Sequence, residues 1–435
     1  MIEVREHYGA RSADSEKRWS PSEVGLEVAR ERRLFSNARK HRNVPCFLLT
    51  RQPTGDYRLE TNYYIGLDWI NAERQTSIFV EPKLNHAGQQ VDVLRMLLDC
   101  ITDEATAPHI RSIYTIQWDA PKLTLPQEKD FLTPFLLVEF LGVLKTIVRK
   151  GLRKSYRRTR RTLRGRMKGK LHVTSTVRHH VTTGNQLGSV CSYDEFTVDT
   201  PENRLLKRAL EFVQRHLPSM FPNGKVPDSV VQLYGYLRPA FERVGTDSNQ
   251  TLRNFRPNPF FTEYEEGLRL AQLILSRFGY NIHSDARNQE IKFPPFWIDM
   301  SLLFELYVLR LLSHQFKLNS ELKYQFQAKK QYLDYLLRRG DLRMVIDAKY
   351  KPIYQSNVSN KKGKTDKKDM RQISGYARLN KVRNWLNVPE DQLVDCLIIY
   401  PKREAEATDS FDELCKHPIS GYTKIYKWGV SLPVR

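Results

Sequence analysis

Two carboxylates and a lysine lie close together in one stretch of this chain and could together hydrolyse a phosphodiester. They are Asp334, Asp347 and Lys349. Mg²⁺ prefers oxygen ligands and is commonly held by one or two carboxylates, with water and substrate phosphate completing its shell; Mn²⁺ accepts similar ligands. A bound cation lowers the pKa of its water, which can then attack phosphorus, and a nearby lysine can orient that water. We therefore expect a Mg²⁺ site, with Mn²⁺ as a substitute, at the two aspartates.

A β-hairpin would bring these three side chains to one face of a sheet. Arg339-Gly340 suits a two-residue hairpin turn, and this turn places Asp334 opposite Val345. Side chains alternate with period two along a strand, so Asp334, Asp347 and Lys349 share a face. The two aspartates then become diagonal neighbours, roughly 7–8 Å apart at the backbone. A four-residue turn keeps this arrangement, whereas a three-residue turn would break it.

An exposed hairpin that merely alternates charged and apolar residues would have the same spacing, but neighbouring features argue against that simpler interpretation. Gln372 and Tyr376 are four residues apart on a predicted helix, so they occupy one face and could contact a nucleic-acid backbone and support Lys349. Glu305 lies in an otherwise apolar helix upstream of the hairpin. Two interpretations of Glu305 stay open: an edge position on a buried face, or a third metal ligand.

A net charge of +21 on 435 residues indicates a polyanionic partner. Such an excess raises the local concentration of nucleic acid, although it identifies no reaction. The strongest electrostatic feature is Arg149–Lys170, which contains twelve Lys or Arg and no Asp or Glu. Like charges at this density repel one another unless an anion is present, so we expect contact with nucleic-acid phosphates there, with docking on an acidic protein surface as the alternative. The residues assigned to DNA are Arg153, Lys154, Arg157, Arg158, Arg160, Arg161, Arg164, Arg166 and Lys168.

Cysteine use and hydropathy predict a cytoplasmic protein with no membrane partner. The five cysteines are scattered, odd in number and never paired as C-x-x-C, which argues against a zinc site and a disulfide framework. The N-terminus has no apolar signal core. The longest apolar run, Phe131–Val148, is interrupted by Pro134, Glu139 and Lys145 and predicts a buried helix rather than a membrane span.

The pattern of apolar residues and of capping and turn signals along the chain predicts a mixed α/β (α+β multidomain) protein of three parts. Ser20-Pro21-Ser22-Glu23 carries capping-box and proline signals for a helix that would run toward Arg42, and strands are expected at 57–59, 63–69 and 76–80. The expected parts are an N-terminal β-rich module (1–124), a helical, basic middle region (125–284) and a C-terminal domain (285–435). The last should have a central mixed sheet flanked by helices.

The order of these motifs resembles known nucleases. A helix with Glu305, the D…D-x-K hairpin and a helix with Gln372 and Tyr376 resemble the core of the PD-(D/E)XK nucleases, in particular their RecB-like branch. Most of the chain is similar to McrC, the nuclease subunit of McrBC-type restriction systems that act on DNA containing 5-methylcytosine. This similarity rests on Tyr64-Ile-Gly-Leu67, Val80-Glu-Pro-Lys83, Gly151-Leu-Arg-Lys-Ser-Tyr156, Leu163-Arg-Gly-Arg166, Tyr193-Asp-Glu-Phe-Thr197 and Asp199-Thr-Pro-Glu-Asn-Arg-Leu-Leu-Lys207.

The resemblance implies a Mg²⁺-dependent nuclease that cuts double-stranded DNA only when assembled with an McrB-like AAA+ GTPase ring. The ring would recognise the modified base, and the N-terminal part of this chain would dock on the ring and stimulate its hydrolysis. Two copies facing one duplex, a homodimer, would suit cleavage of both strands. The positions that match the nuclease motifs are Asp334, Asp347, Lys349, Gln372 and Tyr376, with Glu305 as the weaker match.

Two functions of other classes remain open. A stand-alone DNA repair or recombination nuclease would cut plain duplex with Mg²⁺ and no partner. A non-catalytic adaptor that activates a AAA+ ring would work without its carboxylates, which the filled catalytic positions disfavour. The sequence has no P-loop motif G-x-x-x-x-G-K-[ST], so nucleotide hydrolysis would have to come from another polypeptide.

Overall fold

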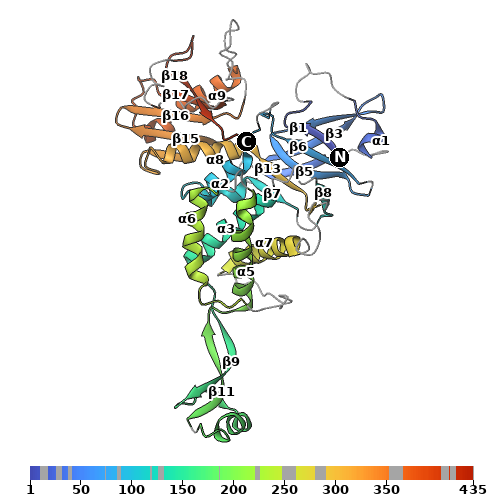
Figure 1. Ribbon diagram of the computed structural model, residues 1–435. Coiled ribbons are helices and arrows are strands. Elements are labelled where there is room, and N and C mark those ends of the chain that lie inside the picture. The colour runs from blue at the N-terminus through green and yellow to red at the C-terminus, as the bar shows by residue number, and fades with distance from the viewer. Residues whose placement is uncertain are drawn as a thin grey trace. The chain divides into compact units, whose positions relative to one another are not determined.

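The chain folds into two compact units. The computed structural model describes residues 1–9, 18–25, 32–37, 42–73, 75–85, 90–117, 120–125, 132–185, 187–220, 226–246, 261–279, 291–351, 366–402, 411 and 418–434. Unit 1 joins Met1–Phe131 to Gln289–Arg435, and unit 2 is Leu132–Asn288. In Figure 1, unit 1 is coloured blue to cyan and orange to red, and unit 2 is mostly green and yellow.

The first sheet of unit 1 has the order β1-β6-β5-β13-β7. Strands β1 and β6 are parallel, and the other neighbours are antiparallel. Strand β13 comes from far along the sequence, yet it lies between β5 and β7, and its Trp297 is buried in one core with Phe47, Tyr57 and Tyr64. The strands are β1 (Ile2–Arg5), β5 (Tyr64–Asn71), β6 (Thr76–Glu81), β7 (Tyr114–Ile116) and β13 (Phe296–Asp299).

Smaller elements surround this sheet. Strands β2, β3 and β4 form an antiparallel sheet, and β8 pairs with β12. Helix α1 has the expected capping box, in which Ser20 and Glu23 bond reciprocally, but it ends at Gly25 in a left-handed conformation. These elements are α1 (Pro21–Val24), β2 (Arg32–Asn37), β3 (Arg42–Arg51), β4 (Tyr57–Thr61), α2 (Val93–Thr102), the 3₁₀ helix η1 (Ala107–Ser112), β8 (Leu123–Leu125) and β12 (Ile291–Phe293).

The second large sheet of unit 1 has the order β14-β15-β16-β17-β18. Strands β14 to β16 are antiparallel, and β16 to β18 are parallel. Tyr335 on one face donates to the carbonyl of Glu305 in α8, whereas Leu336 and Val345 on the other face pack with Ile373 of α9. The elements are α8 (Met300–Ser313), β14 (Leu322–Ala328), β15 (Gln331–Arg339), β16 (Leu342–Ala348), α9 (Lys367–Ala377), α10 (Asn380–Leu386), β17 (Asp395–Lys402) and β18 (Ile425–Ser431).

Unit 2 combines packed helices with a long antiparallel hairpin. Helix α3 packs on α6 and α7, and α5 packs on α7, while β9 and β11 extend from the helices and carry short elements at their far end (Figure 1). The elements are α3 (Leu132–Lys150), β9 (Ser155–Arg164), β10 (Lys170–Leu171), α4 (Val173–Thr176), the π-helix η3 (Val177–Val181), β11 (Gly188–Thr197), α5 (Pro201–His216), the 3₁₀ helices η4 (Leu217–Met220) and η6 (Arg238–Phe241), α6 (Asp228–Leu237) and α7 (Thr262–Gly279).

The predicted mixed α/β fold with a central mixed sheet is confirmed, but two details differ from the expectation. The expected N-terminal and C-terminal modules fall into one unit, because β13 is hydrogen-bonded into the first sheet and its last residue, Asp299, caps α8. The basic run, expected within a helical region, forms strand β9. No helix among the described residues is long and apolar enough to cross a membrane.

Candidate active site

The β15–β16 hairpin turns one residue later than the sequence suggests. The turn is Gly340-Asp341 rather than Arg339-Gly340, and Gly340 has a φ of +54°, a conformation that glycine adopts without steric penalty. The register therefore differs from the prediction by two residues. A shift of two keeps the same side chains on the same face, whereas a shift of one would exchange the faces.

This register places the two aspartates directly opposite each other. Tyr335 pairs with Ile346, so the next pair outward is Asp334 with Asp347, which were expected as diagonal neighbours. The Asp334 carboxylate accepts a hydrogen bond from the backbone N–H of Ala348, with 2.9 Å between Oδ2 and N. Strand β15 is thus fastened to the end of β16 by the side chain that the sequence assigned to metal binding.

Lys349 lies beside the buried aspartate. Asp347 is 3% exposed, and its Oδ2 is 2.7 Å from Lys349 Nζ. The buried carboxylate is therefore joined directly to the lysine ammonium. The same ammonium also donates to Gln372, as described below.

The electrostatics of the pair follow from burial and from the two carboxylates. The pKa of Asp347 is raised to about 7, mainly by burial; the charge of Lys349 opposes this rise, and the Asp334 carboxylate adds to it. Burial by itself lowers the pKa of Lys349, but the carboxylates of Asp347 and Asp334 outweigh burial and the pKa is raised overall. Lys349 is therefore a stable cation, whereas Asp347 needs more positive charge nearby to be fully ionised at neutral pH.

Helix α9 supplies the next two predicted residues. Lys349 Nζ donates to Gln372 Oε1 at 3.1 Å, and Gln372 Nε2 donates to the Tyr376 hydroxyl at 2.6 Å. The spacing of four residues on a helix places both side chains on the face that meets β16. The structure thus brings all five predicted catalytic residues together: Asp334, Asp347, Lys349, Gln372 and Tyr376.

Three further residues at this site were missed by the sequence analysis. Lys351 donates to both carboxylate oxygens of Asp369 at 2.8 Å and to Asp366 at 2.9 Å. Asp366 caps the start of α9, and the charge of Asp369 contributes to the raised pKa values of Asp347 and Lys349. An aspartate pair three residues apart at the start of a helix, downstream of a lysine, was the available signal.

Glu305 lies apart from the carboxylate pair. The side chain is 8% exposed and accepts a hydrogen bond from Gln325 at 3.5 Å. Its helix packs on the sheet face that carries Tyr335, whereas Asp334 and Asp347 belong to the alternate face. Among the described residues no group of three or more His, Cys, Asp or Glu side chains could hold a metal ion. Of the two interpretations of Glu305, this arrangement favours a buried edge position over a third ligand.

A pair of aspartates is nonetheless a fitting donor set for Mg²⁺. This ion is usually held by one or two carboxylates and retains several waters. Asp347 offers a buried carboxylate, and continuing the β15–β16 register by one pair places Asp334 opposite it. A divalent cation between them would offset the burial that raises the pKa of Asp347.

The predicted DNA-binding residues lie on or beside β9, in unit 2. Register and alternation place Arg157 and Arg161 on one face of the β9–β11 hairpin and Arg158, Arg160 and Arg164 on the other. Carboxylates occur on the first face, where Arg157 pairs with an aspartate at 2.6 Å and Arg161 with a glutamate at 3.9 Å. On the second face the three arginines are exposed, and one carboxylate, that of Asp194, lies across the ladder from Arg158. The charge of this strand is therefore partly compensated, on one side more than the other.

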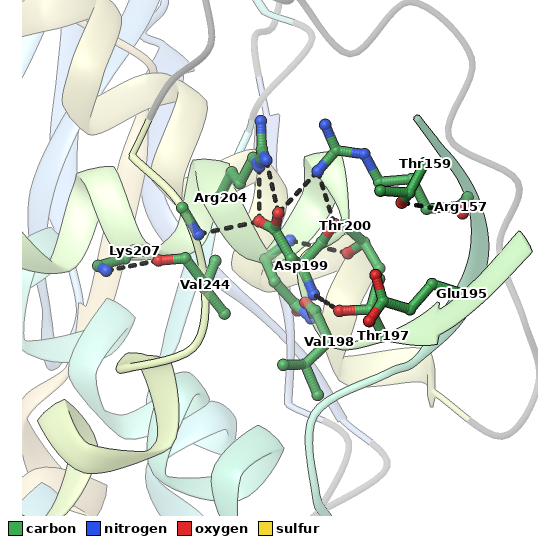
Figure 2. A network of polar contacts seen from close by, with 12 residues as sticks. Arg157, Thr159, Glu195, Thr197, Val198, Asp199, Thr200, Arg204, Lys207 and Val244 are labelled. Atoms are coloured by element: carbon green, nitrogen blue, oxygen red, sulfur yellow. Dashed lines mark hydrogen bonds and ion pairs between the residues drawn. The ribbon is translucent and has the colours of Figure 1, made fainter. Parts of the chain in front are cut away.

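A polar network holds the base of this hairpin to α5 (Figure 2). Asp199 accepts hydrogen bonds from Arg204 Nε at 2.6 Å, from Arg157 Nη1 at 2.6 Å and from the N–H of Gly245 at 2.9 Å. The hydrogen bond from Arg204 is the main reason that the pKa of Asp199 falls to about 2. Asp199 is thus a charged structural anchor.

Asn203 completes the same anchor from the first turn of α5. Its amide nitrogen donates to the carbonyls of Arg153 and Val198, and its oxygen accepts from the Tyr264 hydroxyl at 2.8 Å. Tyr264 in turn accepts from the N–H of Arg153 at 2.7 Å. The Asp199–Lys207 motif therefore fixes both ends of the hairpin, one before β9 and one after β11.

Comparisons with solved structures give weak overall likeness. One is McrC bound in a tetradecameric assembly of Thermococcus gammatolerans McrB AAA+ hexamers, at 16% sequence identity and a TM-score of 0.37, covering 88% of this chain and 80% of that chain. Another is the Thermococcus gammatolerans McrBC complex, at 16% identity and a TM-score of 0.29, covering 59% of this chain and 68% of that chain. No curated protein matches the chain.

A family comparison is decisive. The family model described as McrBC 5-methylcytosine restriction system component matches residues 59–401. The match covers well over half of the sequence and includes the β9–β11 hairpin, the facing aspartates and α9. The resemblance inferred from the motifs is confirmed at this level, and the chain belongs to the McrBC 5-methylcytosine restriction system component family.

Proposed function

We propose that this chain is the Mg²⁺-dependent endonuclease subunit of a McrBC-like restriction complex. It would cleave DNA when assembled with an AAA+ GTPase that recognises modified cytosine and whose hydrolysis it stimulates. The observation that carries the proposal is the connected polar array of the β15–β16 hairpin and α9. In this array a buried aspartate faces a second aspartate and contacts a lysine that is itself held by a glutamine.

Each side chain has a distinct role in the proposed chemistry. Asp334 and Asp347 would hold the cation between their carboxylates. The bound cation would supply positive charge at the scissile phosphate and lower the pKa of its water. Lys349 would orient the attacking water and offset the negative charge that develops on phosphorus. Gln372 accepts from Lys349 and donates to Tyr376, which restricts the directions in which the ammonium group can point.

DNA contact is assigned to the basic strand. Arg158, Arg160 and Arg164 project from one exposed face of β9, on which Asp194 is the cross-strand neighbour of Arg158, and phosphates could supply further counter-charge there. Arg153, Lys154, Arg166 and Lys168 at the ends of the strand would extend this surface. Such contacts contribute affinity and salt dependence but little sequence preference, which agrees with recognition of the modified base by a partner.

The assignment of a partner rests on family membership and on the absence of a P-loop motif from the sequence. The solved relatives are McrC bound to McrB AAA+ hexamers and a McrBC complex, and we propose a corresponding AAA+ GTPase for this chain. Two copies of the chain acting on one duplex would account for cutting both strands.

Reconstitution tests this function. The chain is combined with an McrB-like AAA+ GTPase from the same organism, and cleavage of methylated and unmethylated duplex is followed with GTP and Mg²⁺. We expect double-strand cleavage only when the methylated duplex, the partner, GTP and Mg²⁺ are all present, and none after EDTA is added.

Two outcomes would favour the other classes of function. Cleavage of plain duplex by the chain alone, at the rate of the complex, would identify a stand-alone nuclease. Stimulated GTP hydrolysis without any cleavage of methylated DNA would identify a non-catalytic adaptor. Each outcome contradicts the proposal at a different point, the first in its dependence on a partner and the second in its chemistry.

A further inference from the structure

Tyr350 follows the active-site lysine directly and is buried between the two halves of unit 1. It is 4% exposed, and its ring centroid lies 5.8 Å from that of Phe304 in α8. On its other side, the ring lies under Lys83, whose Nζ is 4.0 Å from the centroid. Lys83 belongs to the Val80–Lys83 motif, which lies in the N-terminal segment of unit 1 (Met1–Phe131). The proposed chemistry gives this motif no role.

Glu6 completes this buried group. It follows β1 as Lys83 follows β6, and its N–H donates to the carbonyl of Glu81 at 2.9 Å. Its Oε1 accepts from the N–H of Lys83 at 3.0 Å, and its Oε2 is 3.7 Å from Lys83 Nζ. Burial raises the pKa of Glu6, against the lowering by Lys83. Burial likewise raises the pKa of Tyr350, and the Glu6 carboxylate raises it further.

The backbone around Lys349 connects the Tyr350 ring, and with it Lys83 and Glu6, to the position of the active-site lysine. The N–H of Lys349 donates to the carbonyl of Ile399 at 2.8 Å, which continues the ladder with β17, and the N–H of Lys351 donates to the carbonyl of Lys349 at 2.7 Å. The chain thus leaves the sheet in one tight turn at Lys349. Lys351 is held by α9 through Asp369, and Tyr350 is held by the N-terminal segment.

We propose that Glu6, Lys83 and Tyr350 form a positioning cluster through which the N-terminal segment sets the placement of Lys349 against Asp347. The two anchors act on consecutive residues, Tyr350 from the first sheet and Lys351 from α9. The Lys83 side chain is only 12% exposed, and a cation that is largely shielded from solvent is held on an aromatic face more strongly than an exposed one. The first sheet is then part of the cleavage machinery in addition to any docking role, and this inference rests on the proposed nuclease function.

Lys83→Met tests the cluster, because it keeps the length of the side chain and removes the charge. In the assembled complex, with saturating DNA and Mg²⁺, we expect the single-turnover cleavage rate to fall about 10- to 100-fold, as expected for a misplaced catalytic group. The affinity for DNA should stay unchanged. Lys83→Arg, which can keep a cation over the ring, should recover most of the rate. Tyr350→Phe is a milder variant in case Lys83→Met fails to fold.

Arg310→Met is the matched control. Arg310 on α8 pairs with Asp99 on α2 at 3.7 Å, with a partly exposed side chain, so its loss also removes an ion pair between the N-terminal segment and the C-terminal part of unit 1. We expect this variant to cleave at the wild-type rate. If Lys83→Met loses no more activity than Arg310→Met, or if Lys83→Arg recovers nothing, the cluster is only structural and the inference is wrong.

Amide hydrogen exchange separates this inference from the proposed function. In the complex without DNA, exchange at Lys349 should be faster in Lys83→Met than in the wild type and unchanged in Arg310→Met. A wild-type complex that does not cleave DNA would overturn the nuclease proposal, and the exchange measurement would still test the cluster. Unchanged exchange at Lys349 in Lys83→Met would contradict the cluster whatever the complex cleaves.

Discussion

Replacing Asp347 by asparagine is expected to abolish DNA cleavage by the assembled complex while leaving the fold intact. Asparagine has nearly the same shape but no negative charge, so the facing pair would keep a single carboxylate. A cation-dependent step loses several kcal/mol of transition-state stabilisation without its cation. At about 1.4 kcal/mol per factor of ten, cleavage should fall by roughly 10³-fold or more. Rapid-quench assays with saturating Mg²⁺ and DNA would measure the loss.

Asp395→Asn provides the matched control in the same sheet. Asp395 begins β17, is half-buried, and pairs with Lys424 at 3.7 Å. Burial raises its pKa, as it does for Asp347, but its backbone lies beside Met344, at the other end of β16. We expect Asp395→Asn to cleave normally. Comparable losses in both variants would mean that removal of any buried charge disables the sheet, and the assignment of Asp347 would fail.

A large loss of DNA affinity is expected when the face of β9 that carries Arg158, Arg160 and Arg164 loses its charge. Changing Arg158, Arg160 and Arg164 together to glutamine removes three exposed charges from one side of the strand. Each phosphate contact contributes about −0.9 to the slope of log affinity against log salt concentration. The slope should therefore become shallower by about 2.7, and affinity should fall for every duplex alike. Fluorescence anisotropy at several salt concentrations would measure both quantities.

An equal change of charge elsewhere in unit 2 distinguishes contact from general attraction. Arg215, Arg238 and Arg243 are exposed on or near α5 and α6, and their triple glutamine variant also lowers the charge by three. We expect it to shift the slope far less. If both triple variants behave alike, the strand makes no specific contact with DNA. If the β9 variant keeps its DNA affinity but loses the AAA+ partner, the basic strand docks on an acidic protein surface instead.

The arrangement of the candidate site could be predicted better than the elements around it. That Asp334, Asp347 and Lys349 share a face could be inferred, although the aspartates were expected as diagonal neighbours, because period-two alternation tolerates an error of two residues in the register. The basic strand was placed in a helical region because uniformly charged residues give no periodicity of apolar positions. Its threonines and Tyr156 favour a strand, and hydrogen bonding to β11 along its whole length stabilises this strand.

Long-range pairing and the faces of buried helices could not be inferred. Strand β13 is four residues long and pairs with residues more than two hundred positions earlier, which no local pattern reports. Helix α8 is buried from Leu302 to Leu309 on nearly every side, so its sequence could not indicate which face Glu305 occupies. The capping box at Ser20 predicted where α1 begins, but residues 32–37 form β2 instead of continuing a helix.

The site of metal binding can be located directly by replacing Mg²⁺ with Fe²⁺ in the assembled complex and generating hydroxyl radicals with ascorbate and peroxide. Radicals form at the bound ion and cut the polypeptide nearby, and the cut positions are read by mass spectrometry. We expect cuts next to Asp334 and Asp347 that disappear in Asp347→Asn and in the presence of excess Mg²⁺. Cuts located elsewhere, or an unchanged pattern in Asp347→Asn, would contradict the two-aspartate site on which the proposed cleavage depends.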